Sequence, residues 1–223
     1  MHSLEAKRVR GVVFDLWNTL AYNDHRPNPI VALGDAFGLR GRPGWTKSIE
    51  RGIMRERLSG IEEGMEALSR LTGKRLARDQ VEELGRNWRE GCTRTRFFRE
   101  VPEVLRRLAR RFHLGLLSNT QSFDLEFLDR SDLPLSARLF SYELGVLKPH
   151  PALFLRMADL LKMAPSELLM VGDNLEDDVT GAEAAGWQAL LIRRRNAPLS
   201  FQEPCPDRRF IASLEPLPSI LLI

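Results

Sequence analysis

The sequence has few cysteines, no apolar run long enough to cross a bilayer, and little net charge. Its two cysteines, Cys92 and Cys205, are far apart and lack metal-ligand spacing, so we expect reduced thiols rather than a disulfide or zinc site. The N-terminal residues lack the apolar segment of a signal peptide, and the C-terminal stretch SILLI is too short to span a membrane. We therefore expect a cytoplasmic protein without a membrane segment.

The charge balance argues against a nucleic-acid partner. A formal net charge of +3 over 223 residues is too small to indicate binding to a phosphate backbone. Hydrophobic residues make up 43% of the chain, which is enough to bury a sizeable core.

Two parts of the chain differ in their apolar pattern. Residues 9–15 form an apolar run that ends at a polar cluster, as in a buried parallel strand. Between about Asn28 and Gly91 the apolar residues recur at helical spacing and no strand is convincing, so we expect about four helices. After Phe98, strand patterns alternate with helix patterns, which predicts a parallel sheet.

The predicted architecture is an α/β protein with a Rossmann-like, doubly wound parallel sheet core and an inserted all-helical domain. We place the core at residues 1–21 and 97–223 and the helical insertion at residues 22–96. Within the second core segment the patterns predict helices over 101–112, 122–129, 149–163 and 176–186, strands over 113–119, 138–142, 167–174 and 187–192, and a last short strand and helix.

Polar residues stand at the ends of three predicted strands. Asp15 ends the first, Ser118 and Asn119 end a second, and Asp173 ends a third. In open parallel sheets, ligands bind outside the carboxyl ends of the strands. An aspartate or serine alone could be a turn or cap residue, but three such clusters together predict a functional site at this edge.

Two further features point to the same edge. Lys148 is one of five lysines in a chain with 28 arginines, so its position favours a compact point charge over a planar guanidinium. An acidic helix start, favoured by the helix dipole, explains one or two carboxylates. It does not explain Asp173, Asp177 and Asp178 together, directly after a buried strand.

Four segments in this order resemble the haloacid dehalogenase-like superfamily. They are FDLWNTL, LLSNT, GVLKPHPALF and VGDNLEDDVTGAEAAGW, which together extend from Phe14 to Trp187. The helical insertion lies where many members of this superfamily carry a cap domain. The resemblance implies a hydrolase that acts on a small-molecule substrate, and we expect a monomer or homodimer.

The resemblance also implies roles for individual residues. Asp15 matches the nucleophile that forms an aspartyl intermediate, and Ser118 and Lys148 match the groups that assist it. Mg²⁺ prefers oxygen ligands, and the matching ligands are Asp15, the backbone carbonyl of Trp17, and Asp173. The remaining matches are Thr19, Ser118, Asn119 and Lys148 as phosphate-binding residues, and Asn174, Asp177 and Asp178 as residues that orient the metal ligands from behind.

Trp17 departs from the phosphatase pattern of the superfamily. Phosphatases carry an aspartate at this position, which protonates the leaving group and later activates water. An indole can do neither, and loss of a general acid or base costs about 10² to 10⁴ in rate. Asp24 and His25, near the start of the insertion, are candidate substitutes.

Three functions remain open at this point. The favoured one is a Mg²⁺-dependent phosphohydrolase that acts through an aspartyl phosphate on a small phosphorylated metabolite, without the usual aspartate acid. The second is a metal-independent 2-haloacid dehalogenase, since those relatives carry a tyrosine at the Trp17 position. The third is a weak or inactive member that serves as a binding protein. A Schiff-base mechanism would need Lys47 or Lys74, and neither has a sequence context that favours it.

Overall fold

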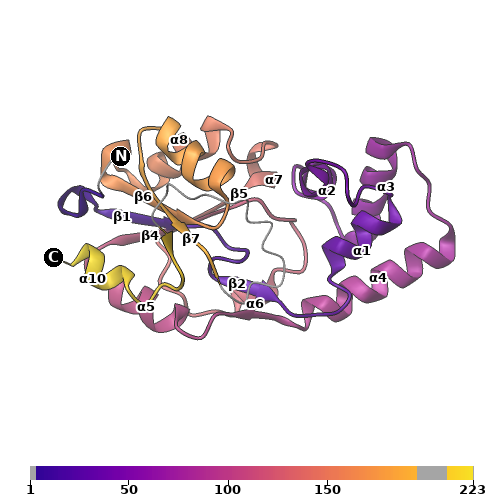
Figure 1. Cartoon of the computed structure of the whole chain (residues 1–223), viewed down its shortest axis with the longest axis horizontal. Helices are drawn as coiled ribbons and strands as arrows, with labels where there is room; N and C mark the ends of the chain where they lie inside the picture. The colour runs from indigo at the N-terminus through magenta and orange to yellow at the C-terminus, as the bar shows by residue number, and fades with distance from the viewer. Residues whose placement is uncertain (1–3, 195–209, 223) are drawn as a thin grey trace.

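The computed structural model describes residues 4–194 and 210–222. Its core is a six-stranded sheet in the order β5-β4-β1-β6-β7-β8, in which every neighbouring pair is parallel (Figure 1). This order confirms the predicted doubly wound sheet. The strands are β1 (Gly11–Phe14), β4 (His113–Ser118), β5 (Ala137–Phe140), β6 (Leu168–Gly172), β7 (Gln188–Ile192) and β8 (Phe210–Ile211).

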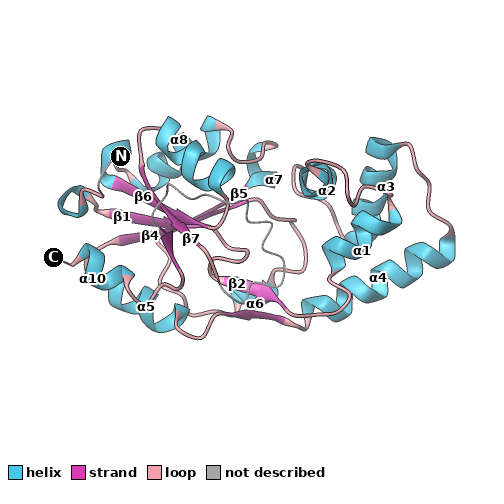
Figure 2. Cartoon of the chain, in the orientation of Figure 1, coloured by secondary structure: helices cyan, strands magenta, loops and turns pink. Residues whose placement is uncertain are grey.

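Helices cover both faces of the sheet (Figure 2). One face packs on α5 (Val101–Leu108) and α10 (Leu217–Leu221), and the other on α8 (Pro151–Leu161) and α9 (Gly181–Ala184). The shorter elements are α6 (Glu126–Asp129), α7 (Ser141–Leu144), the 3₁₀ turns at Ala6–Arg8 and Pro165–Glu167, and the π-helical turn at Leu175–Thr180.

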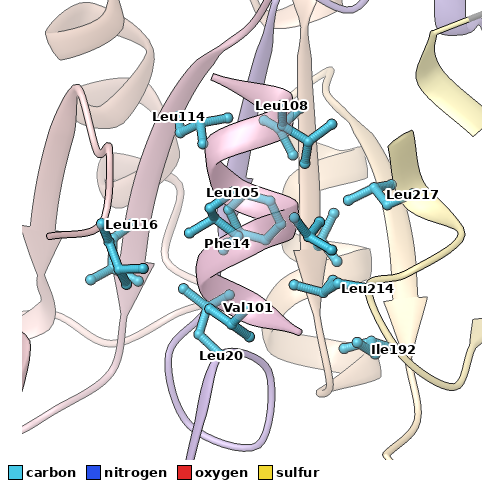
Figure 3. Packing of buried hydrophobic residues seen from close by; sticks show 14 of the residues in the cluster. Phe14, Leu20, Val101, Leu105, Leu108, Leu114, Leu116, Ile192, Leu214 and Leu217 are labelled. Carbon is cyan, nitrogen blue, oxygen red and sulfur yellow. The ribbon is translucent and has the colours of Figure 1, made fainter. Parts of the chain in front are cut away.

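Strand β1 lies in the middle of the core. All four of its residues are buried, because it pairs with β4 on one side and β6 on the other and is covered on both faces. Alternate side chains serve the two faces: Phe14 joins the cluster under α5, while Val13 joins the cluster under α8. Figure 3 shows Leu105 and Leu108 of α5 among the side chains that pack with Phe14.

The insertion contains four helices, as its apolar spacing predicts. They are α1 (Pro29–Ala36), α2 (Trp45–Ile53), α3 (Ile61–Thr72) and α4 (Arg78–Cys92). Figure 1 shows them grouped at one end of the molecule, apart from the sheet. They enclose an apolar cluster of their own, which includes Leu33, Ile49, Ile53 and Leu68.

A two-stranded antiparallel ribbon connects the two parts. Strand β2 (Ala21–Asn23) leaves the core and β3 (Thr95–Phe97) returns to it. The sequence did not indicate this ribbon, because strands of three residues are too short to display an alternating pattern. Both predicted boundaries of the insertion, after residues 21 and 96, fall within the ribbon and stay a prediction as domain limits.

Two remaining sequence observations concern membranes and cysteines. Within the described ranges, no helix combines the length and the apolar character needed to cross a membrane. Cys92 is a free, half-buried thiol on α4, where burial and the nearby Asp124 raise its pKa to about 12. Cys205 lies outside the described residues.

We predict that Leu105→Ala lowers the free energy of unfolding by about 2–5 kcal/mol, because it leaves a cavity against β1. Leu105 is fully buried, whereas Leu155, on the outer side of α8, is 54% exposed. Leu155→Ala is therefore the matched control and should change stability by no more than about 0.5 kcal/mol. Urea unfolding measures both, and equal effects would contradict the packing described above.

Candidate active site

The ammonium group of Lys148 is the centre of the polar cluster at the sheet edge. Its Nζ donates to Asp15 Oδ1 at 2.7 Å, to Asp178 Oδ1 at 2.5 Å and to the carbonyl oxygen of Leu117 at 3.0 Å. An ammonium has three donors, and all three are used. Lys148 is 3% exposed, so this charge is held inside the protein by its partners.

Strand order explains why these groups meet. Asp15 follows directly after β1, and its backbone N–H continues the pairing with β6 by donating to Val171 at 3.0 Å. Ser118 is the last residue of the neighbouring β4, and its hydroxyl donates to Asp15 Oδ1 at 3.2 Å. Parallel strands end at one edge, which is why the sequence could place Asp15 and Ser118 together.

Asn119 holds the loop that carries Lys148. Its side-chain oxygen accepts from the Lys148 backbone N–H at 2.8 Å, and its amide donates to the Lys148 carbonyl at 3.4 Å. The contacts that the structure shows for Asn119 position the Lys148 backbone, and its role in binding phosphate stays a prediction.

Three carboxylates converge on this edge of the sheet. One oxygen from each of Asp15, Asp173 and Asp178 lies within 4.8 Å of the others. Asp173 also accepts a hydrogen bond from the side chain of Asn18. The sequence assigned Asp178 to a position behind the ligands, but the structure brings its carboxylate into the cluster itself.

Gly172 explains the position of Asp178. A Cβ at residue 172 would lie 2.2 Å from Asp178 Oδ2, so the carboxylate occupies the space that a side chain would take. Asn174 fixes the same turn: its backbone N–H donates to Asp178 Oδ2 at 3.0 Å and its side chain accepts from the N–H of Asp177. A motif comparison cannot show this close approach, because it depends on the backbone path after β6.

The cluster carries more negative than positive charge. Burial, together with the charge of Asp178, raises the pKa of Asp15 to about 6 despite the opposing effect of Lys148. Burial and the charges of Asp15 and Asp178 also raise the pKa of Asp173 well above its usual range. Burial disfavours the charge of Lys148, but its two carboxylate partners outweigh that effect and raise its pKa.

A divalent cation fits this donor set. Three carboxylates face one ammonium, and the raised pKa values of Asp15 and Asp173 indicate that the fully ionised cluster lacks a counter-charge. The donors are all oxygens, the type that Mg²⁺ prefers. Asp15, Asp173 and Asp178 are the residues that would hold it; the backbone carbonyl of Trp17 stays a predicted ligand.

The helical insertion contributes two charged residues: Glu50, which the sequence did not indicate, and Lys47, which the sequence raised only for a Schiff-base mechanism that its context did not favour. Lys47 of α2 pairs with Asp177 Oδ2 and lies 3.4 Å from Glu50 Oε2. Burial disfavours the charge of Lys47, yet Glu50 and Asp177 outweigh it and raise the lysine pKa. The chain has only five lysines, and this scarcity drew attention to Lys148. The same argument could have been applied to Lys47.

A cavity of about 560 Å³ lies between the sheet edge and the insertion. Asp15, Lys148 and Asp173 line it from the core, and Lys47 and Glu50 line it from α2. Apolar walls come from Trp45, Trp88 and Ile30. The cavity is thus polar on the side of the carboxylates and partly aromatic on the side of the insertion.

Trp17 forms part of the cavity wall and does not fill the site. Its indole Nε1 donates to Thr120 Oγ1 at 3.0 Å, and its ring centroid lies 5.9 Å from that of Phe127. Phe97 continues this aromatic contact with Phe127 at 5.5 Å. Both Trp17 and Asp15 line the cavity, so the indole leaves the carboxylate accessible.

Four other predicted residues do not line the cavity. Thr19 and Ser118 are fully buried, Ser118 in contact with Asp15 as described above, and their direct contact with phosphate stays a prediction. Asp24 is exposed, and His25 Nε2 lies 2.9 Å from Asn87 Oδ1, so neither candidate acid faces the cavity. Asp177 reaches it, through the pair with Lys47.

A comparison with protein families agrees with this geometry. The sequence model described as haloacid dehalogenase-like hydrolase matches residues 9–186, which is well over half of the chain. The chain belongs to the haloacid dehalogenase-like hydrolases. The family match confirms the resemblance that the four segments indicated.

Individual relatives include both phosphatases and dehalogenases. A phosphoserine phosphatase of Thermus thermophilus is 34% identical over 163 residues, which cover 66% of this chain and 65% of that protein. A 2-haloacid dehalogenase from Pseudomonas syringae aligns in structure with a TM-score of 0.63 and 25% identity, over 96% of this chain and 98% of that chain. A phosphatase of the same family from Thermococcus onnurineus has the same TM-score and coverage at 20% identity, which shows the shared fold.

We predict that Gly172→Ala destabilises this hydrolase by about 1–3 kcal/mol, because the added methyl group collides with the Asp178 carboxylate. In an Asp178→Ala background the collision partner is gone, so the same glycine change should cost at least about 1 kcal/mol less. Urea unfolding of the four proteins in a metal-free buffer measures this coupling. Additive effects would show that the two residues do not touch.

Proposed function

We propose that this hydrolase is a Mg²⁺-dependent phosphohydrolase that acts on a small phosphorylated metabolite through an aspartyl phosphate on Asp15. The observation that carries the proposal is the cluster of three carboxylates on the wall of a cavity, one of which, Asp15, is bound to Lys148. A metal-dependent phosphatase needs a cation site at this place, and the donor set suits one.

The chemistry assigned to the chain starts at Asp15. Ser118 and Lys148 both hold Oδ1, so we assign the attack on phosphorus to Oδ2. The bond between phosphorus and the leaving oxygen breaks as the new bond to Oδ2 forms, and water then releases phosphate and regenerates the carboxylate. Lys148 offsets the repulsion between the carboxylate and the phosphate oxygens. Mg²⁺, when bound, supplies further positive charge for the same purpose.

The relatives support a phosphohydrolase without naming its substrate. The phosphoserine phosphatase from Thermus thermophilus is aligned over 65% of its own length, so its substrate is not carried over to this chain. The aromatic side of the cavity, formed by Trp45 and Trp88, is where the leaving group would lie.

A metal-independent 2-haloacid dehalogenase is the second candidate. It is favoured by the aromatic residue at position 17 and by the likeness to the Pseudomonas syringae dehalogenase. A haloacid substrate would bring a fourth carboxylate towards Asp15, Asp173 and Asp178. Without a cation, that arrangement is repulsive, which is why we place this candidate second.

We predict hydrolysis of acetyl phosphate or p-nitrophenyl phosphate that requires Mg²⁺ and is abolished by Asp15→Asn, because the amide is not a nucleophile. Phosphate release with Mg²⁺ or with EDTA measures this requirement. Absence of Mg²⁺-dependent turnover across a broad panel of phosphates would refute the proposal. Halide release from 2-chloropropanoate in EDTA would establish the dehalogenase instead.

We predict that saturating Mg²⁺ raises the melting temperature by about 5–10 °C at 100-fold excess over its dissociation constant. Asp173→Asn should remove this shift, because the variant loses a ligand. In EDTA at pH 7.5 the same variant should be more stable than wild type. The raised pKa of Asp173 means that its ionisation opposes folding as pH rises through that pKa, and an amide avoids this cost.

The control for this measurement is Asp132→Asn, at an exposed carboxylate in a loop. It should change neither the melting temperature in EDTA nor the response to Mg²⁺. A magnesium shift that survives Asp173→Asn would place the cation elsewhere.

A further inference from the structure

The first question left by Trp17 is which group protonates the leaving oxygen. Phosphoryl transfer is in line, so the leaving oxygen lies on the side of phosphorus opposite to the attacking oxygen. Asp15 attacks from the sheet edge, and the opposite side of the cavity is formed by the helical insertion. The missing acid is therefore to be sought on the insertion.

Glu50 is the one carboxyl group that the described part of the insertion places on the cavity wall. Among the core acids on the same wall, Glu176 is exposed and follows β6 at the same sheet edge as Asp15, so it lies on the side of the attacking carboxylate.

Three other core acids on this wall have partners of their own. Asp124 accepts from Trp88 Nε1 at 2.9 Å, and Asp177 accepts a hydrogen bond from Lys47, which leaves Glu50 at the longer distance of 3.4 Å from the same ammonium group. Asp173 belongs to the carboxylate cluster described above.

A short chain of contacts links Glu50 to the nucleophile. Glu50 Oε2 lies 3.5 Å from the amide nitrogen of Asn119, and Asn119 holds the backbone of Lys148. Lys148 in turn donates to Asp15 Oδ1. The side chain of Glu50 is 21% exposed, so it lies largely within the protein while it still borders the cavity.

We propose that Glu50 is the general acid and base of this hydrolase and takes the role that Trp17 does not fill. The inference rests on the proposed aspartyl-phosphate chemistry. Trp17 is committed to the wall through Thr120 and Phe127, and the proton is supplied from the other side of the substrate.

The surroundings of Glu50 are consistent with a proton donor. Burial raises its pKa, and the positive charges of Lys47 and Lys148 only partly oppose this effect. Lys47 faces it from the same helix, Asn119 from the end of β4, and Lys148 from the loop before α8. Asp177 also pairs with Lys47 and shares that charge.

The two half-reactions balance in protons and electrons. In the first, Asp15 attacks phosphorus, the leaving oxygen departs with the bonding pair, and protonated Glu50 gives that oxygen its proton. In the second, the Glu50 carboxylate takes a proton from water as the water oxygen attacks the phosphorus of the aspartyl phosphate. The Asp15 carboxylate is released with the bonding pair, inorganic phosphate leaves, and Glu50 is protonated again.

Glu50→Gln tests the assignment with two esters of similar shape. Phenyl phosphate has a leaving group that needs a proton, and its turnover should fall by about 10² to 10⁴. With p-nitrophenyl phosphate, whose leaving group needs little help, the variant should release one equivalent of p-nitrophenol rapidly and then stall. The stalled protein should carry phosphate on Asp15, detected by mass spectrometry after an acid quench.

Glu56→Gln is the matched control, since Glu56 is exposed just beyond the end of α2. It should behave as wild type with both esters. The inference would be overturned if Glu50→Gln lost the same fraction of its turnover with both esters and did not accumulate the phosphorylated protein. Glu50 would then act only by holding Lys47 in place. Wild-type turnover in Glu50→Gln would overturn it as well.

Failure of the proposed function gives a different result. In that case the wild-type protein with Mg²⁺ releases no phosphate from either ester and acquires none on Asp15. The Glu50 assignment then falls with the aspartyl-phosphate chemistry on which it rests.

Discussion

The buried ammonium group of Lys148 is the contact on which the arrangement of the site depends. It joins Asp15 after β1, the Leu117 carbonyl in β4 and Asp178 after β6, which are the ends of three adjacent strands. These groups surround Lys148, and a compact charge with three donors satisfies them where a planar guanidinium would not. Removing that charge would leave buried carboxylates unpaired, which costs several kcal/mol. The strand order brings these acceptors together, and a lysine is the residue whose charge can contact all of them. Both features therefore serve the same buried contact.

The sheet was predictable because its strands are buried on both faces and alternate with amphipathic helices. Apolar runs such as residues 9–15 carry that information locally. The β2–β3 ribbon was not predictable, since its pairing joins residues more than 70 positions apart through strands of three residues. The segment predicted as a helix over 122–129 is helical only at Glu126–Asp129. Short elements of this kind depend on tertiary contacts more than on their own pattern.

The residues of the site likewise fall into those that the sequence could predict and those that it could not. Asp15, Ser118 and Asp173 follow from their places at strand ends, because parallel strands share an edge. Asp178 can join the carboxylate cluster because Gly172 has no side chain and leaves space for it. The spacing of residues in the sequence does not reveal this close approach. Lys47 reaches the site only because the helical insertion folds back over the sheet edge, a long-range event that the periodicity of α2 does not reveal.

The core and the helical insertion each form one side of the site. This division suggests a physical reason for the tryptophan at position 17, where phosphatases of the superfamily carry an aspartate. The core supplies Asp15, the proposed nucleophile, and the other carboxylates, whereas the insertion supplies Lys47 and Glu50 on the opposite side of the cavity. An aspartate at position 17 would leave the polar contact with Thr120 and the aromatic contact with Phe127 unfilled, because its side chain is much shorter than an indole. Tryptophan makes both contacts by packing its ring and bonding its N–H. In the mechanism that we propose, proton transfer from Glu50 requires the insertion to lie over the core, so that water exclusion and protonation of the leaving group occur in the same closed arrangement.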